Sequence, residues 1–111
     1  MLFSIQANAM NGNGFISVCE NDNSQNSEFV CMAYLQAGID SVLNGQKTFQ
    51  SFSEEIKKAI ADKMTVSCMP EIETNQAKMI VLKWYRDNPE KLNKFAISEI
   101  IPALQKSFPC K

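Results

Sequence analysis

The clearest pattern in the chain lies between residues 74 and 86, where apolar residues recur at helical spacing. This spacing predicts a helix, and Thr74 is suited to be its N-cap. The apolar stripe comprises Ala77, Ile80, Val81, Trp84 and Tyr85. Trp84 and Tyr85 are neighbours, so on a helix they point about 100° apart. We therefore expect one of them in the core and one at the surface, with Trp84 inside and Tyr85 exposed.

A long helical pattern covers residues 28–44 and comes before this helix. It ends near Asn44-Gly45, since both residue types are common where helices stop. A short apolar element at residues 15–19 precedes it and is separated from it by a polar turn segment. The residues of the long helix expected to face mainly inward are Phe29, Ala33, Leu35, Ile39, Val42 and Leu43.

The next predicted helix starts at a capping box. Ser51 and Glu54 have the spacing at which a serine hydroxyl and a glutamate carboxylate each accept from the other's backbone amide. The helix then continues to about Lys63, with charged residues on its solvent side. Its inward face is predicted to comprise Phe52, Ile56, Ala59 and Ile60.

The last helix is predicted to follow Asn88-Pro89-Glu90, where proline suits the first helical position and an acidic residue favours the helix start. Pro102 lies inside its apolar pattern and removes a backbone donor, so we expect a kink or an early break near residues 98–101. The inward residues would be Leu92, Phe95, Ala96, Ile100, Ala103 and Leu104. No stretch of useful length alternates with period two, and the fold class predicted is an all-α bundle of about four to five helices.

The length of 111 residues and the 45% hydrophobic content fit one domain, which we place at residues 10–111. Residues 1–9 end in Ala7-Asn8-Ala9, a small-x-small pattern that signal peptidase reads, and we interpret them as a signal-peptide remnant. An ordinary frayed terminus is the alternative for these nine residues. Eleven basic and twelve acidic residues nearly cancel, which argues against nucleic acid or an anionic membrane as a partner.

The four cysteines are Cys19, Cys31, Cys68 and Cys110, and the chain has no histidine. They are far apart in sequence, whereas zinc-binding thiolates usually come in close pairs, so two disulfides are the better interpretation. Three connectivities are open. If the last two helices form an antiparallel hairpin, Cys68 lies near Cys110 and Cys19 pairs with Cys31. Disulfides indicate an oxidising compartment, such as the periplasm.

The chain lacks the residues that most catalytic sites need. Without histidine, and with its cysteines paired, it offers no usual general base or nucleophile, so we predict no enzymatic activity, no metal and no cofactor. The polar segment between the last two helices is instead a candidate partner-binding surface, because a stiff projecting turn needs little ordering on binding. A solvated turn is the plainer interpretation. The partner-binding candidates are Tyr85, Arg86, Asp87, Asn88, Glu90, Lys91 and Lys94.

Two residues of the long helix have alternative interpretations. Tyr34 and Gly38 lie four apart on one face, and the glycine would let a second helix approach closely. That second helix belongs either to the same chain or to another copy.

Several short motifs occur in an order and spacing that resemble a known family. These are Cys31, Tyr34, Gly38 and Asp40 in the long helix, then Cys68-Met69-Pro70, Thr74-Asn75-Gln76, Trp84-Tyr85 with Asn88-Pro89-Glu90, and Ala103-Leu104 with Phe108-Pro109-Cys110. Together they resemble the Rap/Tai family of type VI secretion amidase immunity proteins, over nearly the whole chain after residue 9.

The resemblance implies a periplasmic protein that protects its own cell from a peptidoglycan amidase injected by neighbouring cells. It implies a helical homodimer that binds the amidase effector and occludes its active site. The alternative function is a periplasmic acid or stress chaperone, or another helical binding protein. A chaperone would suppress the aggregation of unrelated clients at low pH, whereas an immunity protein would bind one cognate amidase.

Overall fold

The computed structural model describes residues 10–21, 23–64 and 66–110, and within them the chain forms helices. The elements are α2 (Gly12–Cys19), α3 (Gln25–Gln50), α4 (Glu54–Lys63), α5 (Thr74–Asp87), a 3-10 turn η1 (Pro89–Lys91) and α6 (Ala96–Ser107). The β structure in this part of the chain is limited to two isolated bridges. The predicted all-α fold with two disulfides is confirmed, while the signal-peptide interpretation falls on residues outside those described.

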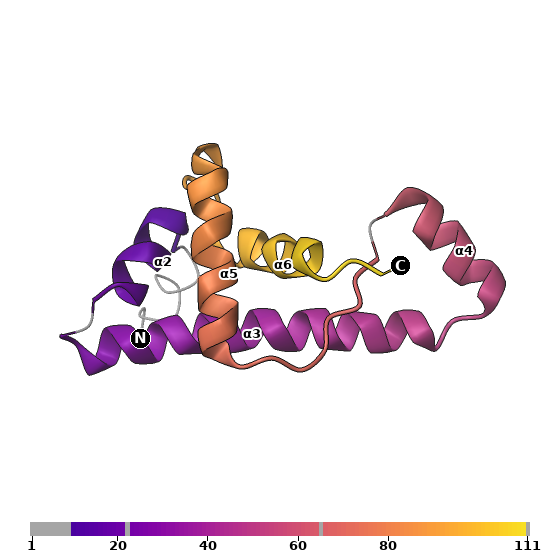
Figure 1. Ribbon diagram of the computed structural model, residues 1–111, viewed down its shortest axis with the longest axis horizontal. Coiled ribbons are helices and arrows are strands. Elements are labelled where there is room, and N and C mark those ends of the chain that lie inside the picture. The colour runs from indigo at the N-terminus through magenta and orange to yellow at the C-terminus, as the bar shows by residue number, and fades with distance from the viewer. Residues whose placement is uncertain (1–9, 22, 65, 111) are drawn as a thin grey trace, which may run out of the picture.

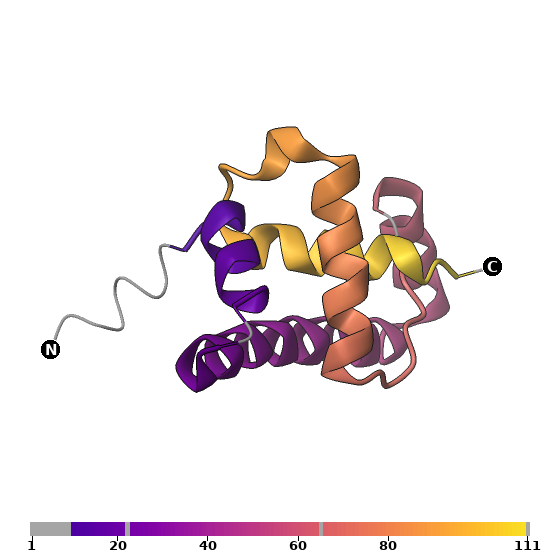
Figure 2. The same ribbon diagram turned by 60° about the vertical axis from the view of Figure 1, so that its left-hand side comes forward.

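Helix α3 is the base of the molecule, and α2, α5 and α6 pack against it (Figures 1 and 2). Their apolar faces meet in one core, because each helix repeats apolar residues every three or four positions. The largest side chains in the core are almost fully buried: Tyr85, Phe15, Leu35, Ile39, Ile100, Leu104 and Val81. In the described residues, no helix is long and apolar enough to cross a membrane.

Gly38 marks the closest approach of α3 and α6. A Cβ atom at this position would lie 2.4 Å from Cγ2 of Ile100, a separation too short for two carbon atoms. Tyr34, one turn earlier, is half-buried and its ring lies 6.3 Å from that of Phe15. Gly38 therefore lets α6 of the same chain approach α3 closely. Of the two alternatives for this glycine, the intramolecular one is observed.

Three predicted helix ends are wrong. Helix α3 continues through Gly45 to Gln50, since Gly45 keeps a negative φ and does not form a left-handed cap. Ser53, and not Ser51, caps α4, by accepting from the Ile56 amide, while the Ser51 hydroxyl donates to the carbonyl of Thr48. Glu73 precedes α5 without a side-chain cap, and Thr74 is the first helical residue.

The region after α5 also differs from the prediction. Pro89 opens only the single turn η1, and α6 starts later, at Ala96. Helix α6 then runs without a break past Pro102. The amide that proline lacks would have bonded the carbonyl of Ser98, which is exposed in the first turn of the helix, where water can satisfy it. The expected early break near residues 98–101 is therefore absent.

Both disulfides have the predicted connectivity, Cys19 with Cys31 and Cys68 with Cys110. The geometry that produces the second one is different from the predicted antiparallel hairpin, because α6 crosses α5 in both views (Figures 1 and 2). Cys68 reaches Cys110 because the segment after α4 runs back to the end of α6. There the Cys68 amide donates to the Phe108 carbonyl over 2.7 Å.

Several residues predicted to face inward lie at the surface. Phe29 is 75% exposed on α3, and Phe95, just before α6, is 59% exposed. Helix α4 has no buried residue at all, although its predicted inward face included Ile56, which is 49% exposed. This helix projects from the end of α3, away from α5 (Figure 1). Amphipathic spacing identified its apolar face correctly but did not reveal that the described part of the chain leaves this face largely exposed.

Candidate functional site

The segment proposed from sequence as a partner-binding surface lies at the C-terminal end of α5, where the chain projects away from α3 (Figure 1). We call residues 86–94 the tip. Six of the seven sequence candidates are in it, and they are all at least partly accessible. Arg86, Asp87, Glu90 and Lys94 are exposed, whereas Asn88 and Lys91 are half-buried.

Tyr85, the seventh candidate, is not a surface residue. It is 1% exposed, and its ring lies 6.4 Å from that of Phe15. The reason lies in the helix register: Ala77, Val81 and Tyr85 are four residues apart and share one buried stripe. Burial, and secondarily the nearby Glu99 carboxylate, raises the pKa of Tyr85 to about 12. The expectation that Tyr85 is exposed is therefore wrong.

Trp84 is the more accessible of the two aromatic neighbours, contrary to the expectation. It is half-buried, and its indole Nε1 donates to Oε1 of the buried Glu99 over 3.1 Å. The ammonium of Lys106 lies 5.3 Å from its ring centroid. The exact spacing of four from Ala77 to Tyr85 was the signal in the sequence that could have assigned the pair correctly.

The tip is held in place by hydrogen bonds at both ends. At the end of α5, the Asn88 side-chain amide donates to the Trp84 carbonyl over 2.9 Å. At the other end, the amide of Gly12 in α2 donates to the Lys94 carbonyl over 3.1 Å, and the amide of Asn13 donates to the Leu92 carbonyl over 3.3 Å. A turn restrained in this way loses little conformational entropy when a partner binds it.

Most charged residues of the tip have no ion-pair partner among the described residues. Lys83 pairs with Asp87 over 2.8 Å and, mainly by donating this hydrogen bond, lowers the pKa of that carboxyl. The other ion pair among the described residues is Lys57 with Glu54, far from the tip. Arg86, Glu90 and Lys91 therefore present charge of both signs to a partner.

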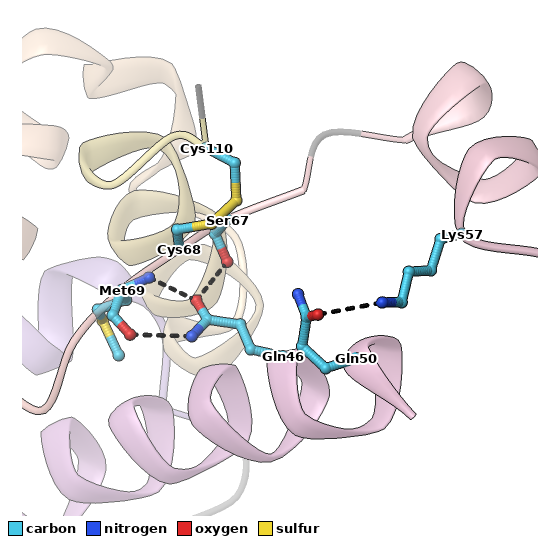
Figure 3. The surroundings of a disulfide bond; sticks show 7 residues. All are labelled: Gln46, Gln50, Lys57, Ser67, Cys68, Met69 and Cys110. Atoms are coloured by element: carbon cyan, nitrogen blue, oxygen red, sulfur yellow. Dashed lines mark hydrogen bonds between the residues drawn. A yellow bond between two sulfur atoms is a disulfide. The ribbon is translucent and has the colours of Figure 1, made fainter. Parts of the chain in front are cut away.

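A second constellation, missed from the sequence, holds the end of the molecule that carries α4 (Figure 3). The side-chain amide of Gln46 bonds the segment after α4 as a neighbouring strand would. Its Oε1 accepts from the Met69 amide over 2.7 Å and from the Ser67 hydroxyl over 2.8 Å, and its Nε2 donates to the Met69 carbonyl over 2.9 Å. Together with the disulfide from Cys68 to Cys110, this contact fixes where the chain returns from α4.

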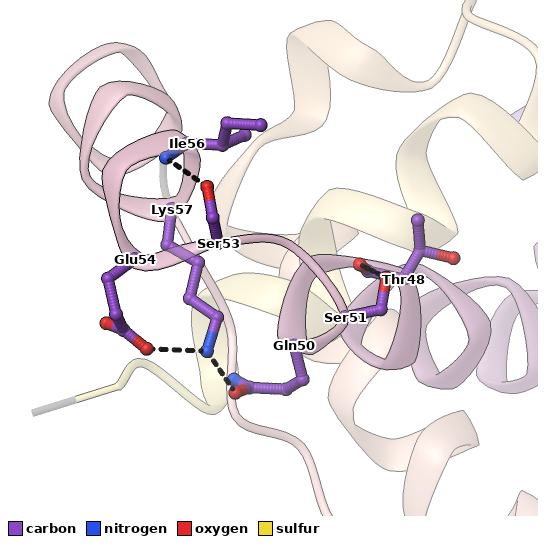
Figure 4. A network of polar contacts seen from close by, with 7 residues as sticks. All are labelled: Thr48, Gln50, Ser51, Ser53, Glu54, Ile56 and Lys57. Atoms are coloured by element: carbon purple, nitrogen blue, oxygen red, sulfur yellow. Dashed lines mark hydrogen bonds and ion pairs between the residues drawn. The ribbon is translucent and has the colours of Figure 1, made fainter.

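The start of α4 is tied to α3 by one lysine. The ammonium of Lys57 donates to Gln50 Oε1 over 3.2 Å and pairs with Glu54 over 3.3 Å (Figure 4). These are exposed polar contacts, worth well under about 1 kcal/mol each. They orient α4, although none of its residues is fully buried.

A groove of about 380 Å³ opens between α4 and the C-terminal half of α3. None of its lining residues is charged, and most of the exposed lining surface is apolar. Sequence reasoning had assigned several of these side chains to the core, so it missed the groove. The lining residues are Ser41, Val42, Gly45, Gln46, Thr48, Phe49, Phe52, Ile60, Met64, Val66, Ser67 and Gln105.

The described residues offer binding surfaces more readily than catalytic chemistry. They hold no group of three or more acidic or cysteine side chains that could bind a metal ion. All four cysteines are consumed in disulfides. What remains is a restrained charged tip at one place and an uncharged apolar groove at another, and both are features by which proteins bind proteins.

Comparison with known proteins identifies the family. Neither the curated proteins nor the solved structures compared with the chain include a match. One family model does match, that of the Rap1a immunity proteins, and it covers residues 11–110. This range includes both disulfides, the tip and α4. The chain therefore belongs to the Rap1a immunity protein family.

Proposed function

We propose that this protein binds a peptidoglycan amidase effector of a type VI secretion system and blocks its active site. The observation that carries the proposal is the family match over residues 11–110, since an immunity protein acts on a secreted effector. The amidase as the effector's activity rests on the resemblance of the sequence motifs. Blocking requires an interface and no catalytic group, and we propose that the protein has no enzymatic activity and needs no cofactor.

The periplasm is the proposed site of action. Two disulfides close the chain, and disulfides of this kind persist outside the cytosol. Peptidoglycan lies in the same compartment, so an effector that attacks it would meet the immunity protein there. We also propose that the protein acts as a homodimer, as the resemblance implies.

The tip is the proposed contact with the effector. Its backbone is restrained at both ends, and its free charges at Arg86, Glu90 and Lys91 can match a charged cleft rim. Tyr85 takes no part in this contact, because it is buried. The residues proposed for the tip contact are Arg86, Asp87, Asn88, Glu90, Lys91 and Lys94.

The test is rescue of cells that direct a candidate amidase to their own periplasm, together with inhibition of the purified amidase. We expect stoichiometric inhibition, and we expect Arg86→Glu with Lys91→Glu to weaken it at least tenfold. The melting temperature should barely change, because exposed substitutions usually shift stability by about 0.5 kcal/mol or less. The matched control, Lys47→Glu with Lys58→Glu, makes the same change in charge at exposed sites away from the tip and should inhibit like the parent.

Two outcomes would contradict parts of this proposal. If the tip variant inhibits as well as the control, the tip is not the contact. If no amidase from the same or a competing organism binds, the target is wrong. Suppression of the aggregation of unrelated proteins at low pH would then favour the chaperone alternative, for which exposed Phe29, Phe52 and Met79 are the relevant observation.

A further inference from the structure

The two disulfides of the protein differ in their exposure to solvent. Cys19 and Cys31 are 4% and 2% exposed and belong to the hydrophobic core. Cys68, in contrast, is exposed, and Cys110 is half-buried. A disulfide is cleaved when a thiolate reaches one of its sulfur atoms, so the rate of cleavage depends on access. The folded protein therefore offers one disulfide to an external thiol and protects the other.

The space around each disulfide differs in the same direction. Cys68 lines a hollow of about 630 Å³ between the last turns of α3 and the segment after α4. Cys110 lines a second hollow of about 550 Å³ beside the end of α4. The space beside Cys19 and Cys31 measures about 70 Å³. This is room for about two water molecules, each of which occupies about 30 Å³ in the liquid.

Cys68 is the better target of the two residues in the exposed bond. Its amide is held by the Phe108 carbonyl over 2.7 Å, and its neighbours Ser67 and Met69 both bond to Gln46 (Figure 3). Cys68 thus keeps its place beside the larger hollow while the bond opens. The Cys110 amide lies 3.5 Å from the nearest backbone acceptor, so this residue is held more weakly and can move away as its sulfur is displaced.

We propose that the bond from Cys68 to Cys110 is a site of thiol–disulfide exchange in the folded protein, where a dithiol reductant attacks Cys68. The attacking thiolate forms a bond to Sγ of Cys68, and the electron pair of the broken S–S bond goes to Sγ of Cys110. The second thiol of the reductant then displaces Sγ of Cys68 and closes the disulfide of the reductant. The protein gains two electrons and two protons, and the dithiol loses both.

The opened form keeps the core and loses one covalent link. Neither Cys68 nor Cys110 belongs to the core cluster, whereas the protected disulfide does. The hydrogen bonds of Gln46 to the segment after α4 also remain. Exchange would therefore loosen the α4 end and leave the tip, at the far end of α5, unchanged (Figure 1). This inference goes beyond the proposed function, because exchange needs no effector.

The first test is partial reduction of the full, oxidised protein with dithiothreitol, followed by alkylation and peptide mass mapping at successive times. We expect Cys68 and Cys110 to be labelled at least tenfold faster than Cys19 and Cys31. In denaturant the two rates should agree within about threefold, because both bonds are then accessible. Equal rates in the folded protein would overturn the proposal. A tenfold difference that persists in denaturant would also overturn it, since access would not be the cause.

The second test identifies the sulfur that is attacked. A thioredoxin-like protein with the second cysteine of its Cys-x-x-Cys motif replaced by serine stops at the mixed disulfide, which acid quenching preserves. We expect this protein to be linked mainly to Cys68, and linkage mainly to Cys110 would overturn the assignment. If dithiothreitol opens the bond and the protein probe forms no link, the site stands and its reductant is a small dithiol instead of a protein.

A pair of charge variants tests the direction of attack independently. Glu71 lines the hollow beside Cys68, and Asp62 lines the hollow beside Cys110, and both are exposed. A thiolate is repelled by a carboxylate near the sulfur that it approaches. At low salt, Glu71→Lys should therefore speed reduction by dithiothreitol several-fold, and the matched control Asp62→Lys should change it less. A larger effect of Asp62→Lys would contradict attack on Cys68. None of these measurements uses an amidase, so their outcome is independent of the proposed target.

Discussion

The two ends of α3 are stabilised in different ways. Up to Val42, this helix packs against α2, α5 and α6 in the core, with Leu35 and Ile39 almost completely buried. Its last turns contact residues 66–73, which we call the return segment, through Gln46, and the start of α4 through Lys57. The disulfide from Cys68 to Cys110 joins the return segment to the residues after α6. Apolar packing is therefore sufficient to place α5 and α6, whereas the α4 end depends on directional polar contacts and a covalent link. Disruption at the two ends should have correspondingly different consequences.

The largest effect should come from removing the disulfide that closes the α4 end. The bond from Cys68 to Cys110 spans 42 residues, and in the chain-entropy model it stabilises the fold by about 4 kcal/mol. The bond from Cys19 to Cys31 spans 12 residues and should contribute about 3 kcal/mol. Unfolding in denaturant of the paired alanine variants would measure the two values.

Hydrogen exchange would localise the loss. In the variant without Cys68 and Cys110, we expect faster exchange at the amides of residues 66–69 and in α4, while those of Val81 and Leu104 remain protected as long as the core stays folded. A larger loss from the Cys19 and Cys31 variant would contradict the role given to loop length. Uniform exchange throughout the chain would contradict the distinction between the two ends.

The next effect concerns the ionisation of Tyr85 in the packed end. Its pKa rises from 10.0 to about 12 in the folded protein, because burial disfavours the phenolate. The folded pKa lies above the unfolded one, so the contribution of the neutral phenol is fully present below pH 10 and is lost as pH rises toward 12. About two units of difference correspond to roughly 2–3 kcal/mol.

The variant Tyr85→Phe isolates this effect. No hydrogen-bond partner is found for the Tyr85 hydroxyl in the described structure, so its removal should be near neutral at pH 7. Above pH 10, the variant should lose less stability than the parent, as thermal unfolding at a series of pH values would show. Equal losses of stability in the variant and the parent would mean that the Tyr85 hydroxyl contacts water in the folded state.

The smallest effect compares two glycines on the same helix. Gly38 faces α6 with no space for a Cβ, whereas nothing lies within 4 Å of a Cβ at Gly45. We expect Gly38→Ala to destabilise by about 1–2 kcal/mol, since overpacking outweighs the gain in helix propensity. Gly45→Ala should stabilise by about 0.5–1 kcal/mol. Paired melting curves would check the opposite signs, and the same sign at both positions would remove the contrast between the two ends.

The residue pattern predicted the parts of the fold that depend on repeated spacing. The stripe through Ala77 and Val81 and the all-α class follow from periodicity, and the presence of two disulfides follows from the number and spacing of the cysteines. Their pairing was predicted correctly, but from a hairpin geometry that the structure does not have. Helix ends were harder, because they depend on single side chains that compete. Ser51 and Ser53 both precede Glu54, and only the geometry decides that Ser53 accepts from the Ile56 amide.

The candidate site was predicted in part. Polar residues in a stiff turn identified the tip, but the register of α5 moved Tyr85 into the core. The exposure of α4 could not be predicted from sequence, because amphipathic spacing shows that a helix has an apolar side and not whether that side is covered. The contact of Gln46 could not be predicted from sequence either. It is made mainly to backbone atoms of Met69, which nearly every residue type has, so no particular residue type signals it.

The bonding of Gln46 to backbone atoms also affects how the sequence can change during evolution. Two of the three hydrogen bonds of Gln46 join it to the backbone amide and carbonyl of Met69. Every residue type except proline has both groups, so a substitution at this position keeps both hydrogen-bond partners. Gln46 thus fixes the path of the return segment, while the outward side chains of that segment are free to change. A lineage under attack by a changing toxin could alter the outward side chains of this segment one by one and keep the same scaffold.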